Sequence, residues 1–315
     1  MPKPKKRGGS NNRWVKKSKP APAPEQKKQD EGMTVQWYPG HMARTRRMIQ
    51  ENLKLVDLVV EIIDARIPLS SRNPDLDELV EGKPRLVLLN RADQADKAQN
   101  QRWAEYFRSR GCSVLQTDCK SGAGVKQFSP VVQSILKEQR SKWEEKGMVG
   151  RAVRVMVVGV PNVGKSTFIN KVASRKSALA QNRPGVTRGK QWVSVDEGLD
   201  LLDTPGILWP KFEDKTVGMH LAFTGAVKDT ALDTETLAMN LMKLLSERYP
   251  EALAERYHIA IPEEPDPWAL VEEAGRKRGF LISGGEVDTE RMSRILLEEF
   301  RSGKLGRFTL ELPPC

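Results

Sequence analysis

The stretch Val153-Arg-Val-Met-Val-Val-Gly-Val-Pro-Asn-Val-Gly-Lys-Ser166 decides the fold. Its first six residues form an apolar, β-branched run of the kind found in buried parallel strands. Residues 159–166 fit the pattern G-x-x-x-x-G-K-[ST], and a helix is expected from Lys165 onward. Glycines in such a loop let successive backbone N–H groups wrap phosphates, and the helix N-terminus adds partial positive charge. The stretch therefore predicts a phosphate-binding loop, or P-loop, between a strand and a helix.

Side chains in and after this loop predict a magnesium nucleotide site. Lys165 is expected to reach the β- and γ-phosphates as a catalytic cation, and the Ser166 hydroxyl to ligate Mg²⁺. Asp203 ends a predicted strand and would hold Mg²⁺ through water, while the backbone of Gly206 would approach the γ-phosphate. Thr187 follows a Pro-Gly pair in a polar loop, where it is either a further Mg²⁺ ligand or part of a plain turn. The expected nucleotide contacts within the P-loop are Asn162, Val163, Gly164, Lys165, Ser166 and Thr167.

Two further motifs predict that the base is guanine. The tetrapeptide Asn90-Arg-Ala-Asp93 follows the apolar run 85–90. A carboxylate at Asp93 can accept two hydrogen bonds from guanine, and adenine lacks that donor pair. Arg91 stands where the N-K-x-D motif of GTPases has lysine, and the two cations are not equivalent. After the next strand, residues 118–124 resemble the loop whose backbone reads the guanine carbonyl. The predicted base-site residues are Asn90, Arg91, Ala92, Asp93, Asp118 and Cys119.

Alternating strand and helix signals predict a doubly wound α/β sheet over residues 34–215. The expected strands are 55–64, 85–90, 113–117, 153–159, 191–195 and 199–203, and the expected helices are 42–54, 97–110, 125–143 and one from 165. Strand signals stop after about residue 215, and a small helical domain is expected over 216–315, with helices at 234–248, 268–278 and 289–302. Residues 1–33 are poor in apolar side chains and are expected to form a disordered basic arm.

The order of the motifs predicts a circular permutation, because the base-reading motif precedes the P-loop. The usual sheet still forms if the ordinary termini are joined, which would occur around residues 143–151. The chain would then be cut just after Gly206. The segment that senses the γ-phosphate would therefore lead directly into the helical domain, so nucleotide state could be passed along one covalent connection.

Charge points to a polyanionic partner. The net charge is +11, and the first 33 residues contain ten Lys/Arg against three Asp/Glu. Such a tail suggests nucleic acid, although a merely solubilising tail is the alternative. Further basic clusters occur at Arg44, Arg46 and Arg47, at Arg276, Lys277 and Arg278, and at Arg301, Lys304 and Arg307. No run approaches the roughly 20 apolar residues of a membrane span, and three cysteines show no metal-ligand spacing. We expect a cytoplasmic monomer with no membrane partner.

Additional motifs carry a resemblance to one family. They are Trp37-Tyr-Pro-Gly-His41-Met, Asp64-Ala-Arg-Ile-Pro68, Asp203-Thr-Pro-Gly-Ile-Leu-Trp-Pro210, Thr224-Gly-Ala, Gly284-Gly-Glu-Val-Asp and Arg301-Ser-Gly-Lys-Leu-Gly306. Together with the nucleotide motifs, over residues 37–311, the chain resembles circularly permuted GTPases of the ribosome biogenesis GTPase A (YlqF-like) family. The resemblance implies late assembly of the large ribosomal subunit and contact of the helical domain with rRNA. It also implies that a hydrophobic residue, here Ile207, replaces the catalytic glutamine.

Ile207 cannot orient a water, so two candidates for the catalytic role stay open. Asn162 lies where cation-dependent GTPases hold K⁺ beside the phosphates, or it only caps the loop. His41 would reach the γ-phosphate on the ribosome, or it is structural. The expected function is a GTPase that binds the large subunit or its precursor with GTP, is stimulated by that particle and leaves after hydrolysis. The alternatives are an RNA-binding scaffold with negligible turnover, or a GTPase of small-subunit assembly or tRNA modification.

Overall fold

The computed structural model describes residues 40–80, 82–173, 191–196, 198–204, 214–227 and 233–314. Several predictions fall outside these ranges: the disordered arm 1–33, Thr187, Gly206 and Ile207. His41 lies in a described helix, but its side chain and that of Arg44 are outside the described part.

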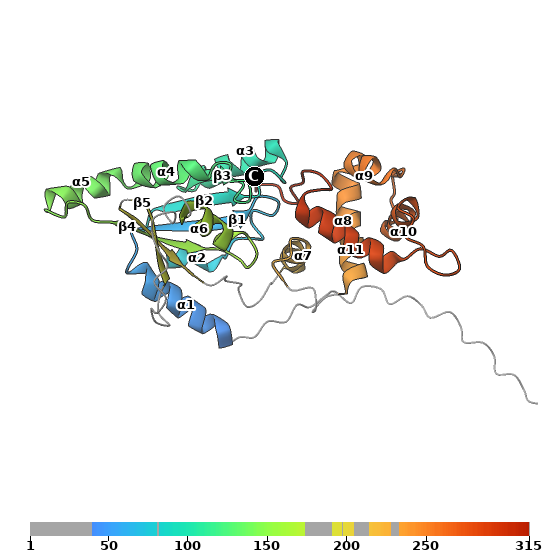
Figure 1. Cartoon of the computed structure of the whole chain (residues 1–315), viewed down its shortest axis with the longest axis horizontal. Helices are drawn as coiled ribbons and strands as arrows, with labels where there is room; N and C mark the ends of the chain where they lie inside the picture. Colours follow the sequence, from blue (N-terminus) through green and yellow to red (C-terminus); the bar gives the residue numbers. More distant parts are fainter. Residues whose placement is uncertain are drawn as a thin grey trace, which may run out of the picture. The chain divides into compact units, whose positions relative to one another are not determined.

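In the described part of the chain, six strands form one sheet in the order β3-β2-β1-β4-β6-β5 (Figure 1). The strands are β1 (Leu58–Asp64), β2 (Arg85–Asn90), β3 (Ser113–Thr117), β4 (Val153–Val158), β5 (Gln191–Asp196) and β6 (Leu199–Asp203). All neighbours are parallel except β5, which pairs antiparallel with β6. The doubly wound sheet predicted from the sequence is confirmed.

The strand order shows how the permuted chain builds an ordinary nucleotide-binding sheet. The chain starts at β1, moves outward to β2 and β3, and then returns to place β4 on the other side of β1. Asn90 pairs with Asp64 on one neighbour and with Thr117 on the other, while Asp203 pairs with Val157. The carboxyl ends of five parallel strands therefore meet at one edge, where ligands of open α/β sheets bind at the change of direction.

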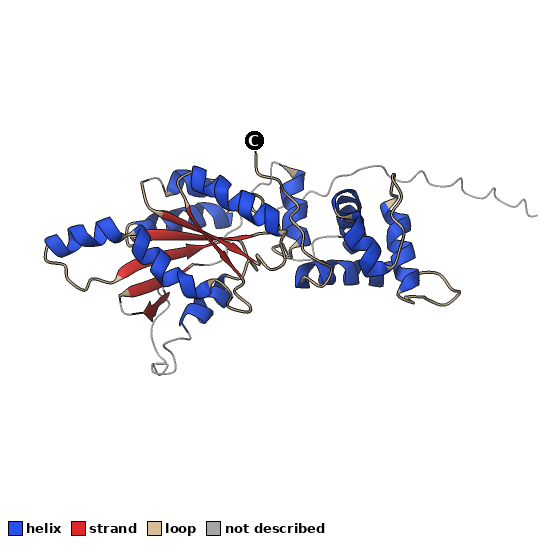
Figure 2. Cartoon of the chain, turned by 90° about the horizontal axis from the view of Figure 1, so that it is seen from above, coloured by secondary structure: helices blue, strands red, loops and turns tan. Residues whose placement is uncertain are grey.

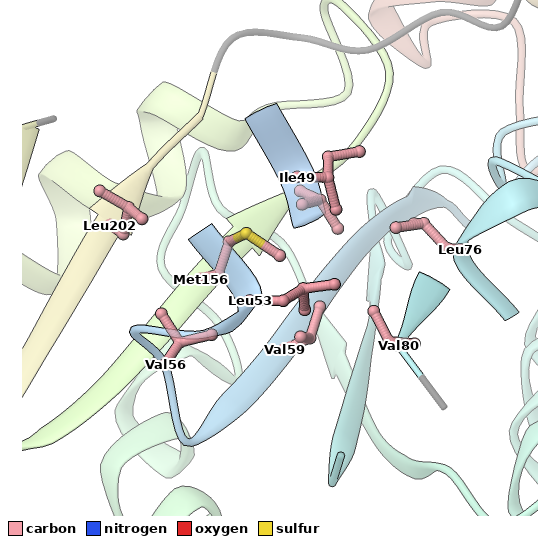
Figure 3. Packing of buried hydrophobic residues seen from close by; sticks show 9 residues of the cluster. Ile49, Leu53, Val56, Val59, Leu76, Val80, Met156 and Leu202 are labelled. Carbon is pink, nitrogen blue, oxygen red and sulfur yellow. The ribbon is translucent and has the colours of Figure 1, made fainter. Parts of the chain in front are cut away.

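Helix α1 (Gly40–Leu53) is anchored on the strands that lead to the phosphate site. Its Ile49 and Leu53 pack in one buried cluster with Met156 of β4 and Leu202 of β6, as Figure 3 shows. Val59 of β1 and Leu76 of α2 (Asp75–Leu79) belong to the same cluster. Burial of such side chains contributes about 1.5–3 kcal/mol each. The C-terminal half of α1 is therefore fixed to the face of the sheet formed by β1, β4 and β6.

The helix α3 (Lys97–Ser109) covers the same face of the sheet. Its Trp103 and Phe107 pack in a cluster with Ile63 of β1. Ile63 lies four residues after Val59, and residues separated by an even number in a strand point to one face. Asp96 caps the helix by accepting a hydrogen bond from the backbone N–H of Gln99. Helices lie on both sides of the strands in Figure 2.

The single helix predicted over 125–143 is wrong. The segment forms a short 3₁₀ turn η1 (Val125–Gln127), then α4 (Phe128–Ile135) and α5 (Lys137–Glu145). Leu136 separates the two helices and is fully buried, whereas α5 buries none of its side chains. The chain therefore bends where its last apolar anchor ends. Phe128 of α4 packs edge-to-face on Phe168 of α6 (Lys165–Ala173), with ring centroids 4.9 Å apart.

All elements described after β6 are helices, and α8, α10 and α11 pack on one another. They are α7 (Lys215–Phe223), α8 (Thr234–Arg248), α9 (Pro250–Tyr257), α10 (Pro267–Lys277) and α11 (Thr289–Ser302). Helices α2, α7 and α9 were not expected from the sequence. Residues 34–315 form one compact unit, so a domain boundary at 215/216 stays a prediction.

The C-terminal tail returns from the helices to the sheet. Leu310 donates its backbone N–H to the carbonyl of Arg66 at 2.7 Å, and Phe308 donates to that of Gln94 at 2.9 Å. The carboxylate of Glu311 accepts hydrogen bonds from the backbone N–H of Leu69 and from Ser70, and it contacts His220 of α7. The tail therefore joins the helical part to the loops that follow β1 and β2.

Candidate GTP-binding site

Two glycines of the P-loop permit contacts that any side chain would block. A Cβ at Gly159 would lie 2.6 Å from the carbonyl oxygen of Ile62 in β1. Gly164 has a φ of +101°, and a Cβ there would collide with the side-chain amide of Asn90. The second contact is the important one, because it brings the base-reading segment directly against the P-loop.

Asn90 links three segments that are far apart in the sequence. Its Nδ2 donates to the carbonyl of Val163 at 2.6 Å, and its Oδ1 accepts from the backbone N–H of Cys119 at 3.0 Å. The side chain is 3% exposed. Buried amides are retained where both ends find partners. In the structure Asn90 positions the two loops that surround the predicted base site, and its contact with the base stays a prediction.

The loop after β3 is shaped by Asp118. Its carboxylate accepts hydrogen bonds from the backbone N–H groups of Lys120 and Ser121, at 2.8 and 3.1 Å. Burial acts to raise the pKa of Asp118, but these hydrogen bonds outweigh it and hold the pKa below its usual value. Burial raises the pKa of the Cys119 thiol to about 11, so the thiol stays neutral. The loop therefore presents backbone groups and a small apolar side chain to the site.

Asp93 of the base motif is exposed. The backbone N–H of its neighbour Ala92 donates to the carbonyl of Thr117 at 3.1 Å. Arg91 has a φ of +59°, which is uncommon for a residue other than glycine. Its Nη2 donates to the carbonyl of Asn162 at 2.9 Å, and its Nη1 to that of Arg301 at 3.2 Å. Arg91 therefore connects the base motif to the P-loop and to α11.

Asn162 is the other strained residue of the site, with a φ of +58°. Its Nδ2 donates to the carbonyl of Gly225, just after α7, at 2.7 Å. The P-loop is therefore hydrogen-bonded to the segment Thr224-Gly-Ala through this side chain.

Two residues expected at the phosphate and Mg²⁺ site, Lys165 and Asp203, lie together. Nζ of Lys165 is 3.8 Å from Oδ1 of Asp203, and this oxygen is buried with no hydrogen-bond partner. Burial lowers the pKa of Lys165, and Asp203 only partly opposes this effect. Thr204 fixes the end of β6 by donating to the carbonyl of Val157 at 2.6 Å. No group of three or more His, Cys, Asp or Glu among the described residues could hold a metal alone. The carboxylate of Asp203, whose buried Oδ1 has no hydrogen-bond partner, suits Mg²⁺ brought by nucleotide phosphates.

A cavity of about 250 Å³ lies between these loops. Four segments line it: the loop after β2, the loop after β3, the P-loop with the first turn of α6, and the end of α11. The lining residues are Asn90, Arg91, Gln94, Asp118, Cys119, Lys120, Gly164, Thr167, Arg301 and Ser302. The lining includes four of the six predicted base residues and two of the P-loop residues, but it does not include Asp93, Lys165 or Ser166. Gln94, Arg301 and Ser302 were missed as site residues, since only the fold places them there.

Comparison with known proteins agrees with this geometry. A family model described as a 50S ribosome-binding GTPase matches residues 154–255. Ribosome biogenesis GTPase A of Bacillus cereus is 47% identical over 282 residues, covering 89% of this chain and 95% of the relative. The chain belongs to the ribosome biogenesis GTPase A family. It is a circularly permuted P-loop GTPase that hydrolyses GTP.

More distant relatives extend over the same region. Mouse mitochondrial ribosome-associated GTPase 1 is 35% identical over 303 residues, covering 89% of this chain and 92% of the relative. The solved GDP-bound structure of Thermotoga maritima YlqF matches with a TM-score of 0.60 and 32% identity, covering 85% of this chain and 99% of that one.

Among the described residues of this family member, no helix combines the length and apolar character that membrane crossing requires.

The structure shows which described side chains of the predicted basic clusters bond within the protein and which are exposed. Arg278 bonds to Glu299 at 3.2 Å and lies over the ring of Tyr257, and Arg301 donates to the carbonyls of Ala222 and Phe223. Both hold the helical part together, and their contact with RNA phosphates stays a prediction. The described basic side chains of the clusters that remain exposed are Arg46, Arg47, Arg276, Lys277, Lys304 and Arg307.

Proposed function

We propose that this GTPase acts in late assembly of the large ribosomal subunit, that it binds the particle in its GTP state and that it leaves after hydrolysis. The observation that carries the nucleotide part is the link through Asn90, which joins the base motif, the loop after β3 and the P-loop in one site. The ribosomal part is supported by family membership and by exposed basic side chains such as Arg276 and Lys277.

In this proposal, each part of the site has one task. The P-loop backbone and Lys165 hold the β- and γ-phosphates, while Ser166, Thr187 and Asp203 hold Mg²⁺, the last through water. Mg²⁺ neutralises charge that develops on the transferring phosphoryl group. Asp93 selects guanine. Asn162 would hold K⁺, or His41 would reach the γ-phosphate on the ribosome, to supply what Ile207 cannot.

Nucleotide state would reach the helical part by two routes. One is the covalent connection from Asp203 to α7. The other is the hydrogen bond from Asn162 to Gly225, which links the P-loop to the end of the same helix. Steady-state GTP turnover with purified large subunits, small subunits or neither tests the proposal. Stimulation by large subunits alone is expected, and equal stimulation by small subunits would contradict it.

A further inference from the structure

One wall of the cavity comes from a part of the chain that ordinary GTPase motifs do not include. The other lining residues belong to the loops after β2 and β3 and to the P-loop side, whereas Arg301 and Ser302 are the last residues of α11. Pockets that enclose whole small molecules measure roughly 300–1,000 Å³. A cavity of about 250 Å³ beside Asn90 and Cys119 is suited to one part of a nucleotide, the base.

The end of α11 is held closely against the base motif. Gly303 follows the helix with a φ of +76°, and a Cβ there would lie 2.8 Å from Cγ of Gln94. Gln94 directly follows Asp93, and its carbonyl accepts the hydrogen bond from the backbone N–H of Phe308. Glycine at this position therefore serves both the helix end and the close approach to Gln94.

Arg91 of the base motif also holds the end of α11 in place. Its guanidinium donates to the carbonyl of Arg301, where a helix C-terminus carries partial negative charge, and also to the carbonyl of Asn162. A lysine is a single point charge, whereas the planar fork of arginine can hold two carbonyls in fixed directions. The arginine that replaces the lysine of N-K-x-D therefore has a structural role, because Arg91 links α11 to the P-loop through two hydrogen bonds.

Arg301 in turn fastens α11 to α7. Its Nε donates to the carbonyl of Phe223 at 3.0 Å and its Nη2 to that of Ala222 at 2.7 Å. The wall of the cavity is thus part of a packed connection that includes α7, α11 and the tail.

We propose that the last turn of α11, at Arg301 and Ser302, forms one wall of the guanine site, so that the helical part of the chain helps to hold the base of GTP and GDP alike. The proposal rests on the assignment of the base site to Asn90 and Asp93. Base occupancy should therefore fix the end of α11 whichever nucleotide is bound.

Thiol footprinting tests this wall with a small change. In the full chain carrying Cys315→Ser, Ser302→Cys places a thiol at an exposed position of the lining, whereas Cys112 and Cys119 are buried. Alkylation at position 302 should slow at least tenfold with saturating GDP or a non-hydrolysable GTP analogue, but not with inorganic pyrophosphate. Arg294→Cys, exposed on the same helix, is the matched control and should react equally in all conditions. Absence of protection at position 302 by either nucleotide overturns the proposal.

A binding measurement supplies a second variant. Ser302→Phe fills the cavity and should raise the dissociation constants of GDP and the GTP analogue by the same factor, at least tenfold. Arg294→Phe should bind as the parent does. Parent-like binding by Ser302→Phe would also overturn the proposal. The base site itself is tested separately by Asp93→Asn. If that variant switches base preference while position 302 stays unprotected, the base site stands and the wall is withdrawn.

Discussion

Asn162 of the P-loop donates its side-chain amide to the carbonyl of Gly225 at 2.7 Å. This bond joins the loop that would hold the phosphates to Gly225, the second residue after α7, over 63 positions of sequence. Among the described elements, α7 is also the first helix after Asp203. A helix that is reached by both the covalent chain and a P-loop hydrogen bond is well placed to move when phosphates bind.

The choice of guanine should depend on the carboxylate of Asp93. Asp93→Asn should weaken GTP binding about 10- to 100-fold, because hydrogen bonds to charged groups contribute about 1.5–3 kcal/mol. Binding of xanthosine triphosphate should improve, since xanthine has a carbonyl where guanine has its amine. Fluorescence titration with both nucleotides measures this. Undiminished GTP affinity would mean that Asp93 does not read the base.

A potassium site at Asn162 predicts a dependence on the monovalent cation. Replacing K⁺ by Na⁺ at equal ionic strength should slow GTP hydrolysis several-fold. Asn162→Gly tolerates the φ of +58° and removes the carboxamide, so its rates in the two salts should be equal and low. Equal rates in both salts for the parent chain would exclude a K⁺ requirement.

His41 is expected to act in hydrolysis on the ribosome and not in nucleotide binding. His41→Ala should leave the dissociation constant of GTP unchanged while lowering particle-stimulated turnover by about 100-fold, as for loss of a general acid or base. Arg47→Ala changes an exposed side chain of the same helix and is the control that separates weaker docking on the ribosome from slower hydrolysis. Loss of folding or of GTP affinity in His41→Ala would support a structural role instead.

Stability should depend on the buried pair Asp64–Arg66. Arg66 is 1% exposed, its Nη2 lies 2.8 Å from Oδ2 of Asp64, and its Nη1 donates to the carbonyl of Phe300 in α11. Arg66→Ala leaves the buried carboxylate with only Nε of Arg91, 3.6 Å away, as an ion-pair partner, and breaking a buried pair costs about 3–5 kcal/mol. Urea unfolding at pH 7 measures this change. Arg47→Ala, at the surface, should change the free energy of unfolding by less than about 0.5 kcal/mol.

The same pair predicts a pH dependence. Burial acts to raise the pKa of Asp64, but the guanidinium of Arg66 outweighs it, so the pKa lies below its usual value of 3.8. A carboxyl group with a lowered pKa stabilises the fold above its unfolded pKa of about 3.9, and this contribution is lost as the pH falls through the folded value. The difference between parent and Arg66→Ala should therefore be largest near neutral pH and shrink below about pH 4. A difference independent of pH would contradict the assignment.

The sequence predicted β2, β3 and α11 with the correct ends, because apolar runs and polar boundaries are local signals. It missed α7, whose interior contains Gly218, although Asp214 caps the helix by accepting from the backbone N–H of Thr216. It also missed α9, where Pro250 at the first position was an available start signal. Asn90 and Arg91 were recognised as site residues, but their bonds to Val163 and Arg301 depend on folding and have no sequence signature.

GTP should promote binding of this GTPase to the large ribosomal subunit. Binding is expected to weaken as salt rises, since exposed basic side chains would contact phosphates. Deletion of residues 1–33 should reduce this salt slope but keep the nucleotide dependence. The most direct measurement is cosedimentation of the full chain with purified large or small subunits, with a non-hydrolysable GTP analogue or GDP. We expect tighter binding to large subunits with the analogue than with GDP. Equal binding in both nucleotide states, or a preference for small subunits, would contradict it.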